Sequence, residues 1–242
     1  WVMDFNLAHN KSKINRLNVR DNSYEPSREG YSVGAVFSLK TAGLDENGLQ
    51  MFYNKQGEKV SFNDFFGLEY GYMMGGLIPF LKSNLSAEEY RNLFTYEGTT
   101  EPKFTGGWIN RFYYKNFDLT VSASFVLDQT VQEQPFYNPV QTSPGQNYSR
   151  RMSQIWSPDN TSGKYPRIMG TYTEGEENWA YQWLGMLDPG NSYRKYDYWF
   201  KKMSYMRINS IRLGYTFPER LLGHIGFSSA RISFEARNPF VF

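Results

Sequence analysis

Apolar and polar residues alternate along several short segments of the chain, which is the period of a β-strand with two different faces. The clearest cases are residues 211–217 and 230–237. Residues 218–226 separate them and contain one proline and two glycines, which is typical of a short connector. These segments together predict an antiparallel hairpin near the end of the chain.

The same alternation predicts three further strands, at residues 3–8 with a continuation through the polar residues 10–13 towards Leu17, at 104–115 and at 117–125. A tight turn at Lys115 and Asn116 would join the last two. In the third segment, one face carries Phe117, Leu119, Val121, Ala123 and Phe125, and the other carries Asp118, Thr120, Ser122 and Ser124. One face therefore suits hydrocarbon and the other suits water.

The alternation slips once, in residues 203–217. Met206 and Ile208 are out of phase with Ile211 and Leu213, so the change lies near Asn209 and Ser210. A β-bulge would restore the facing. Alternatively, the first half of the strand has left the apolar layer and turns polar residues outward at its rim.

Two long segments without sustained period, residues 18–102 and 128–202, separate the predicted strands. The first contains short β candidates at 33–39 and 51–53, and a capping box at Ser86 predicts a short helix through residue 94, as a loop decoration. Loops this long are rare in compact soluble domains, whereas transmembrane barrels join strands by tight turns on one side and long loops on the other. The pattern thus favours a barrel over a soluble sandwich.

Composition supports a folded, β-rich protein. The 242 residues are 40% hydrophobic and 18% aromatic, with 19 Tyr, 19 Phe and 6 Trp. The mean hydropathy is −0.61, and no apolar run approaches the ~20 residues of a helical membrane span. The net charge of +2, with scattered basic residues, gives no reason to expect nucleic acid as a partner. Because the sequence starts at Trp1 without a signal peptide, we expect it to be part of a longer protein.

Candidate catalytic or metal-binding chemistry is weakly represented. There is no cysteine, and His9 and His224 are far apart in sequence, so we predict neither a metal site nor a cofactor. Asp45 and Asn47 resemble half of a calcium loop, but the other ligand positions are missing, which favours a plain turn. The residues alone therefore single out no metal or cofactor site.

Several motifs, in this order, resemble the C-terminal part of SusC/RagA-family TonB-dependent outer-membrane transporters. They are the DFN of residues 4–6 with NKSKI at 10–14, AGLD at 42–45 with FYN at 52–54, EPKFTGGW at 101–108, YKNFDL at 114–119, WSPDNTSGKYPR at 156–167, SYMRINSIRLGYTFP at 204–218 and ARNPF at 236–240. They cover essentially the whole chain. Each motif is short, and their succession carries the resemblance.

The resemblance implies an all-β, transmembrane antiparallel barrel of 22 strands with a plugged lumen and long extracellular loops. Residues 1–242 would supply about five strands near the C-terminus, with the plug domain and the last strand absent. It also implies TonB-dependent import of an oligosaccharide or peptide across the outer membrane, together with a SusD-like lipoprotein. No bond is made or broken in such transport, so the resemblance predicts that the chain is not an enzyme. TonB would act through the absent N-terminal part, and outer-membrane lipid would surround the barrel.

Two other classes compete with this interpretation. A soluble carbohydrate-binding or carbohydrate-active β protein would also explain the aromatic residues, with Glu174, Glu176 and Glu177 as the available carboxylates. No second motif pairs with these glutamates. A passive porin is the other rival, and only the family signature argues against it.

Weak candidates for substrate contact are Trp179, Tyr181 and Trp183, which alternate on what we interpret as an extended segment. Packing between loops or against the lipoprotein is the competing explanation for them. The long segments are rich in aromatic residues, which we expect to be exposed and ordered by the lipoprotein. These are Tyr165, Tyr172, Trp179, Tyr181, Trp183, Tyr193, Tyr196, Tyr198 and Trp199.

The barrel hypothesis also predicts which residues face lipid and which side of the membrane each connector occupies. We expect Ile232, Phe234 and Ala236 to point to lipid with the apolar residues of 117–125, and Arg231, Ser233, Glu235 and Arg237 to line the interior with Asp118 and Thr120. The connectors at 115–116 and 218–226 would be periplasmic, and residues 18–102 and 128–202 extracellular.

Overall fold

The computed structural model describes residues 1–18, 20–73, 78–170, 175–223 and 226–242, so Tyr172, Glu174 and His224 lie outside the described residues. The chain divides into two compact units. The first unit comprises residues 1–12, 99–131 and 202–242, and the second comprises 13–98 and 132–201. Each unit is therefore assembled from segments that are distant in the sequence.

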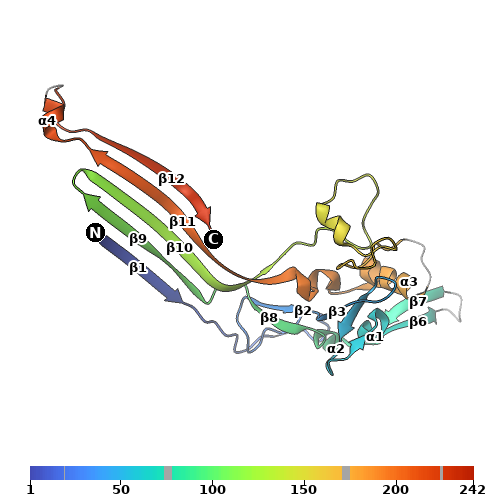
Figure 1. Cartoon of the computed structure of the whole chain (residues 1–242). Coiled ribbons are helices and arrows are strands. Elements are labelled where there is room, and N and C mark those ends of the chain that lie inside the picture. The colour runs from blue at the N-terminus through green and yellow to red at the C-terminus, as the bar shows by residue number, and fades with distance from the viewer. Residues whose placement is uncertain (19, 74–77, 171–174, 224–225) are drawn as a thin grey trace. The chain divides into compact units, whose positions relative to one another are not determined.

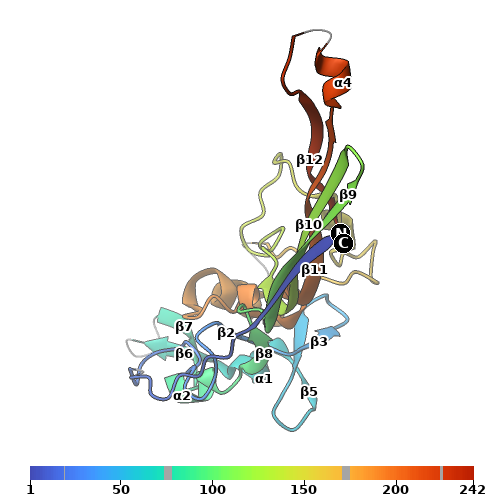
Figure 2. The same ribbon diagram turned by 90° about the vertical axis from the view of Figure 1, so that its left-hand side faces the viewer.

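The first unit is a five-stranded sheet with the strand order β1-β9-β10-β11-β12 (Figure 1). Its strands are β1 (Val2–His9), β9 (Phe104–Tyr114), β10 (Phe117–Gln132), β11 (Phe200–Thr216) and β12 (Arg231–Val241). The pairs β1/β9, β9/β10 and β11/β12 are antiparallel. Figure 2 turns the sheet towards its edge. All five predicted strands are present, and β10 and β11 are longer than the alternation indicated. The predicted continuation of the first strand towards Leu17 was wrong, because β1 ends at His9.

The two predicted tight connectors lie at the same end of the sheet (Figure 1). Lys115 takes a left-handed conformation, with a φ of 51°, in the turn between β9 and β10. The connector between β11 and β12 contains the short helix α4 (Glu219–Leu222). The chain consequently leaves the sheet for both long segments at the opposite end.

A register shift between β11 and β12 lies at the slip in the alternation of β11. Ile208 pairs with Phe240 and Ser210 with Arg237, so Asn209 faces two residues of β12. One of these is Asn238, whose φ of 49° is typical of a bulge position. A β-bulge therefore lies at the position of the slip, but its extra residue is on β12, so a restored facing of β11 itself stays a prediction.

The second unit contains small sheets and short helices. One small sheet pairs β2 (Ala35–Ser38) with β8 (Thr95–Thr99). A second has the order β3 (Thr41–Leu44), β4 (Gln50–Tyr53) and β5 (Lys59–Val60), and a third pairs β6 (Leu68–Met73) with β7 (Ile78–Ser83). Its helices are α1 (Phe62–Phe66), α2 (Ala87–Arg91), α3 (Gly175–Gln182), the 3₁₀ segments Arg150–Gln154, Ser192–Lys195 and Asp197–Trp199, and the π segment Trp183–Leu187. The strand candidates at 33–39 and 51–53 are thus confirmed.

This unit has a hydrophobic core of its own, built mainly from aromatic side chains. Phe52, Phe66, Tyr196 and Trp199 are fully buried in it. Rings meet edge-to-face or stacked, as Phe52 does with Phe65 at a centroid distance of 4.2 Å. Such pairs are worth about 0.5–1.5 kcal/mol each beyond the buried area. The long segments are therefore packed structure rather than open loops.

The short helix predicted at Ser86 forms as α2, with Ser86 and Glu89 completing the capping box. It ends at Arg91, so the prediction of a helix through residue 94 was too long. The prediction that this helix is only a loop decoration was wrong, because it contributes Tyr90 to the core with 1% of its surface exposed. The cap fixes the start of the helix and therefore the direction in which Tyr90 points.

No helix in the described part of the chain is both long enough and apolar enough to cross a membrane.

Candidate functional site

One face of the five-stranded sheet is apolar across neighbouring strands. In β10 and β9, Leu119 pairs with Phe112 and Ala123 with Trp108, so the predicted apolar side chains share their face with aromatic residues. On the other hairpin, Leu213 pairs with Phe234. Because paired residues lie on the same face of a sheet, the predicted apolar grouping is confirmed.

Phe125 extends this surface across two strands. A side chain on Gly106 of β9 would collide with the Phe125 ring, so the glycine leaves the space that the ring fills. The Phe125 ring also stacks on Phe5 of β1, at a centroid distance of 6.3 Å. An aromatic ring over a strand glycine covers backbone that would otherwise be exposed.

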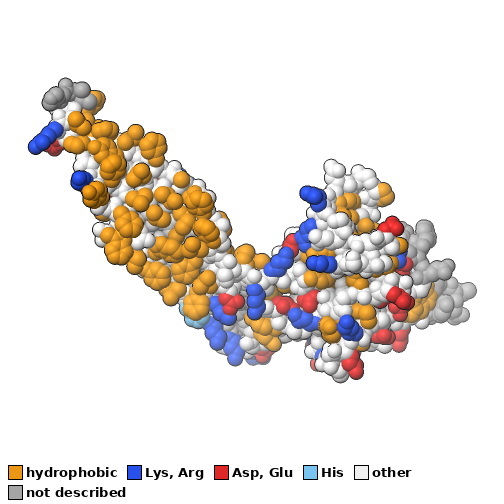
Figure 3. All heavy atoms as spheres, viewed as in Figure 1, with side chains coloured by type: hydrophobic (Ala, Val, Ile, Leu, Met, Phe, Trp, Pro, Cys, Tyr) orange, Lys and Arg blue, Asp and Glu red, His pale blue; other side chains and the backbone are white. Residues whose placement is uncertain are grey.

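The apolar face is exposed rather than packed. Phe5 exposes 58% of its surface, Phe117 49% and Phe234 71%. Among the described residues, the hydrophobic core cluster draws every member from the second unit. Figure 3 shows the hydrophobic side chains gathered over the sheet. Exposed apolar area on this scale marks an interaction surface.

The opposite face of the sheet is polar and internally paired. Arg231 of β12 donates two hydrogen bonds to Asp118 of β10, at 2.8 and 2.7 Å. Asp4 and Arg111 form another ion pair between β1 and β9. The predicted grouping of Asp118 with Arg231 on one face is confirmed by this contact.

Gly214 of β11 makes the contact between Asp118 and Arg231 possible. Its two partners belong to the strands on either side of β11, and a Cβ added at Gly214 would overlap atoms of both side chains. Gly214 is therefore the residue over which the ion pair crosses β11.

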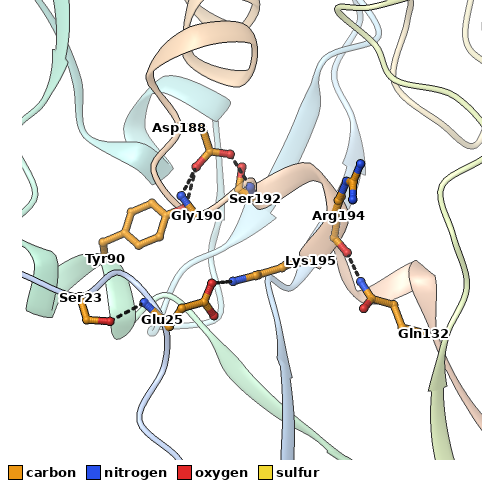
Figure 4. Close-up of polar contacts among 9 residues, drawn as sticks. All are labelled: Ser23, Glu25, Tyr90, Gln132, Asp188, Gly190, Ser192, Arg194 and Lys195. Atoms are coloured by element: carbon orange, nitrogen blue, oxygen red, sulfur yellow. Dashed lines mark hydrogen bonds and ion pairs between the residues drawn. The ribbon is translucent and has the colours of Figure 1, made fainter. Parts of the chain in front are cut away.

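A cleft of about 950 Å³ opens in the second unit. It is lined by residues of the segment 17–28, by β2 and by residues 190–200, together with Gln132. Four basic side chains, Arg20, Arg28, Arg194 and Lys195, face one acidic side chain, Glu25. Lys195 forms an ion pair with Glu25 at 2.5 Å (Figure 4). The cleft therefore carries an excess of positive charge.

A carboxylate fixes the wall of this cleft. Asp188 accepts hydrogen bonds from the Tyr90 hydroxyl at 2.8 Å, from the Gly190 amide at 3.1 Å and from the Ser192 amide (Figure 4). Burial, with the nearby Asp188 charge, raises the pKa of Tyr90 well above its ordinary value, so the phenol remains a neutral donor. These bonds hold the turn that precedes Arg194 and Lys195.

The predicted substrate-contact residues do not lie on an extended segment, so that part of the prediction was wrong. Trp179 and Tyr181 lie on α3, and Trp183 begins the following π segment. Trp183 is buried in the core with 4% of its surface exposed, and the other two pack against that core. A spacing of four residues places Trp179 and Trp183 on one face of a helix. Substrate binding by these three residues stays a prediction.

The expected exposure of the aromatic residues in the long segments was also wrong. Tyr193, Tyr196 and Trp199 are buried in the unit's own core. The Trp199 indole donates to the Tyr193 carbonyl at 3.0 Å, which satisfies its polar atom inside the core. Order in this unit therefore does not require a partner to cover these rings.

Of the alternative catalytic carboxylates, Glu174 lies outside the described residues. Glu177 forms an ion pair with Arg167 at 3.0 Å. In the turn at Asp45, the carboxylate accepts from the amides of Asn47 and Leu49, as expected for a plain turn. Within the described ranges, no group of three or more His, Cys, Asp or Glu side chains is arranged to hold a metal ion.

The sequence offered little signal for the cleft. Arg20, Arg28, Arg194 and Lys195 come from two segments that are far apart in the chain, and neither segment forms a charge run. The fold of the second unit brings them together.

Comparisons with known proteins identify relatives of the chain. No family model matches it. The TonB-dependent receptor P3 of Formosa agariphila is 25% identical over 260 residues, which cover 100% of this chain and 22% of that protein. The chain thus spans less than a quarter of the length of this relative.

Solved structures give a matching fold. The structure of the RagAB peptide transporter matches 99% of this chain and 23% of the solved chain, with a TM-score of 0.64 and 18% identity. The open-open state of the RagAB peptide importer matches with a TM-score of 0.58 and 17% identity. These relatives are receptors and transporters rather than enzymes, in agreement with the prediction. The resemblance to SusC/RagA-type TonB-dependent receptors is confirmed.

Proposed function

We propose that this chain, which resembles a part of a SusC/RagA-type TonB-dependent receptor, forms a portion of that receptor's transmembrane barrel wall. The observation that carries the proposal is a single sheet with one exposed apolar face and one polar, ion-paired face. A soluble sandwich would pack such an apolar face against a second sheet. Lipid and a watery lumen explain both faces at once.

The lengths of four of the five strands agree with a membrane-spanning role, and β1, with 8 residues, is slightly shorter. β9 and β12 have 11 residues each, and β10 and β11 have 16 and 17. A membrane strand tilted by about 45° needs about 9–11 residues to cross the hydrocarbon layer. The two longer strands exceed this length, so their ends would extend beyond the apolar layer.

The complete barrel is proposed to contain 22 strands around a plug, with residues 1–242 near its C-terminus. β1 and β12 are the outermost strands of the described sheet. An unpaired strand edge in hydrocarbon leaves backbone groups without partners, at several kcal/mol each. Further strands of the same protein would pair with these edges and close the barrel.

The activity proposed for the whole protein is TonB-dependent import of an oligosaccharide or peptide across the outer membrane. A SusD-like lipoprotein would assist at the extracellular side, and TonB would act through a part of the protein outside residues 1–242. Support comes from the relatives, one named as a TonB-dependent receptor and another described as a peptide transporter. Trp179 and Tyr181, which are only partly buried, are the proposed aromatic contacts for cargo, with the buried Trp183 as the third candidate.

Fractionation of cells that express the full-length protein tests this function. We expect the protein in the outer-membrane fraction, with the change of gel mobility on heating that folded barrels show, and we expect the SusD-like lipoprotein to co-purify. Recovery of a fully folded protein in the soluble fraction would contradict the proposal.

A further inference from the structure

We propose that the basic cleft of the second unit binds an acidic peptide, which narrows the cargo of the proposed transporter to one chemical class. The assignment of the peptide as transported cargo rests on the proposed function. The cleft itself is defined by the described residues alone. Its volume of about 950 Å³ lies at the upper end of the range for ligand sites. It is therefore large enough for a short stretch of peptide.

The positive charge of the cleft favours a peptide with acidic side chains. Arg28 and Arg194 are exposed, and the salt bridge between Lys195 and Glu25 neutralises the single carboxylate of the lining. Figure 4 shows the Arg194 guanidinium directed away from Gln132, whose side-chain amide donates to the Arg194 backbone carbonyl at 2.6 Å. Arginine is suited to carboxylates because it offers two parallel N–H donors. Arg20, Arg28 and Arg194 are thus the proposed ligands of acidic side chains.

The remaining lining favours a peptide over a sugar. Amide groups of Asn18 and Asn22 can each donate and accept, which suits a peptide backbone. Leu17, Val36 and Phe37 provide apolar surface between the charged groups. Sugar sites rely on broad aromatic platforms, whereas the aromatic rings of this lining are limited to two phenylalanines. A peptide with alternating acidic and apolar residues matches this arrangement.

The wall that presents Arg194 and Lys195 is rigid, which reduces the entropy lost on binding. Asp188 accepts from the Gly190 amide and from the Ser192 amide within the same turn. A side chain on Gly190 would press on the Tyr90 hydroxyl at 2.8 Å, so the close approach of this turn to Tyr90 depends on glycine. The cationic groups are therefore presented from a fixed turn rather than from a free loop.

The test uses the full-length protein in detergent and three labelled peptides of one design, in which Glu, Gln or Lys alternates with Ala and Val. Binding is followed by fluorescence polarisation at low and at physiological salt. We expect the Glu peptide to bind about tenfold more tightly than the Gln peptide, with the preference reduced at higher salt. Equal affinity for the Glu and Gln peptides would overturn the proposal.

Two substitutions test whether the peptide binds in the cleft. Arg194→Gln should weaken binding of the Glu peptide by about tenfold. The matched control is Arg150→Gln, which removes the same charge from an exposed residue of the second unit outside the cleft lining. It should leave the affinity unchanged. Equal effects of the two substitutions would show that net charge rather than the cleft attracts the peptide, and would overturn the assignment.

Two further measurements on the same samples separate the possible failures. Heat-dependent gel mobility reports whether the barrel has formed, so a folded barrel without peptide discrimination would refute the cleft proposal and leave the barrel function intact. Binding is then repeated with the co-purified lipoprotein. Loss of peptide binding in that complex would show that the cleft seats the lipoprotein, which would overturn its assignment to cargo.

Discussion

At the scale of single residues, small side chains decide where the larger ones lie. Gly106 leaves space for the Phe125 ring on the apolar face, and Gly214 leaves space for the contact between Asp118 and Arg231 on the polar face. Neither glycine is needed for a left-handed backbone, since both lie within regular strands. Their role is close approach, which is a common reason for glycine inside a strand.

Substituting Gly214 by alanine should therefore destabilise the sheet. The added methyl group would separate Asp118 from Arg231, and overpacking of this kind costs on the order of 1–3 kcal/mol. The temperature at which the folded gel band disappears should fall. Gly223→Ala is the control, because a Cβ at Gly223 has nothing within 4 Å. An unchanged temperature for Gly214→Ala would contradict the role given to this glycine.

Glu133 in the second unit offers a test by pH. Its hydrogen bonds to Lys201 and then to Arg151 hold the pKa of Glu133 below its ordinary value. A carboxylate whose pKa is lowered by folding stabilises the folded state fully at pH values above its unfolded-state pKa of about 4.3. This stabilisation is lost as the pH falls through the pKa of the folded state. Glu133→Gln should thus be less stable than the wild type at neutral pH and equal to it in strong acid.

The measurement for Glu133 is the resistance of the second unit to protease across a pH series. Exposed Glu46, in the turn after β3, provides the control substitution Glu46→Gln. If Glu133→Gln lost the same stability at every pH, the effect would come from packing rather than from the charge.

At the scale of elements, the long strands could be predicted and the second unit could not. Alternation is a local property, so β9, β10 and β12 follow directly from neighbouring residues. The core of the second unit combines residues from 39 to 199, and its short elements lack a sustained period. The spacing of Trp179, Tyr181 and Trp183 also fits a strand, but burial of Ala180 and Trp183 stabilises a helical segment instead.

The apolar face of β10 provides an element-scale prediction. Val121→Arg should cost on the order of 2–4 kcal/mol if that position lies near the middle of the bilayer. The yield of folded, heat-modifiable protein in the outer membrane should drop accordingly. Thr120→Arg is the matched control, because its side chain lies on the polar face of the same strand. Equal loss of folded protein in both variants would contradict the assignment of the faces.

At the scale of the whole molecule, the connections of the sheet predict the side of the membrane for each segment. Both short connectors lie at one end of the sheet, and both long segments leave from the other. Short turns are periplasmic and long loops extracellular in such barrels. Protease added to intact cells should therefore cut within residues 18–102 or 128–202, at sites exposed on the second unit. Cleavage confined to 115–116 and 218–226 would reverse the proposed orientation.

The central claim is that the apolar face of the sheet meets lipid, and spin labels test it most directly. Single cysteines at residues 117–125 of the full-length protein, in a background with no other cysteine, would carry the label in a lipid bilayer. The account predicts that collisions with oxygen, which concentrates in hydrocarbon, are high at Phe117, Leu119, Val121 and Phe125. Collisions with a water-soluble nickel complex should be high at Asp118, Thr120, Ser122 and Ser124 instead. Loss of this alternation, or protection of both faces from both reagents, would contradict the account.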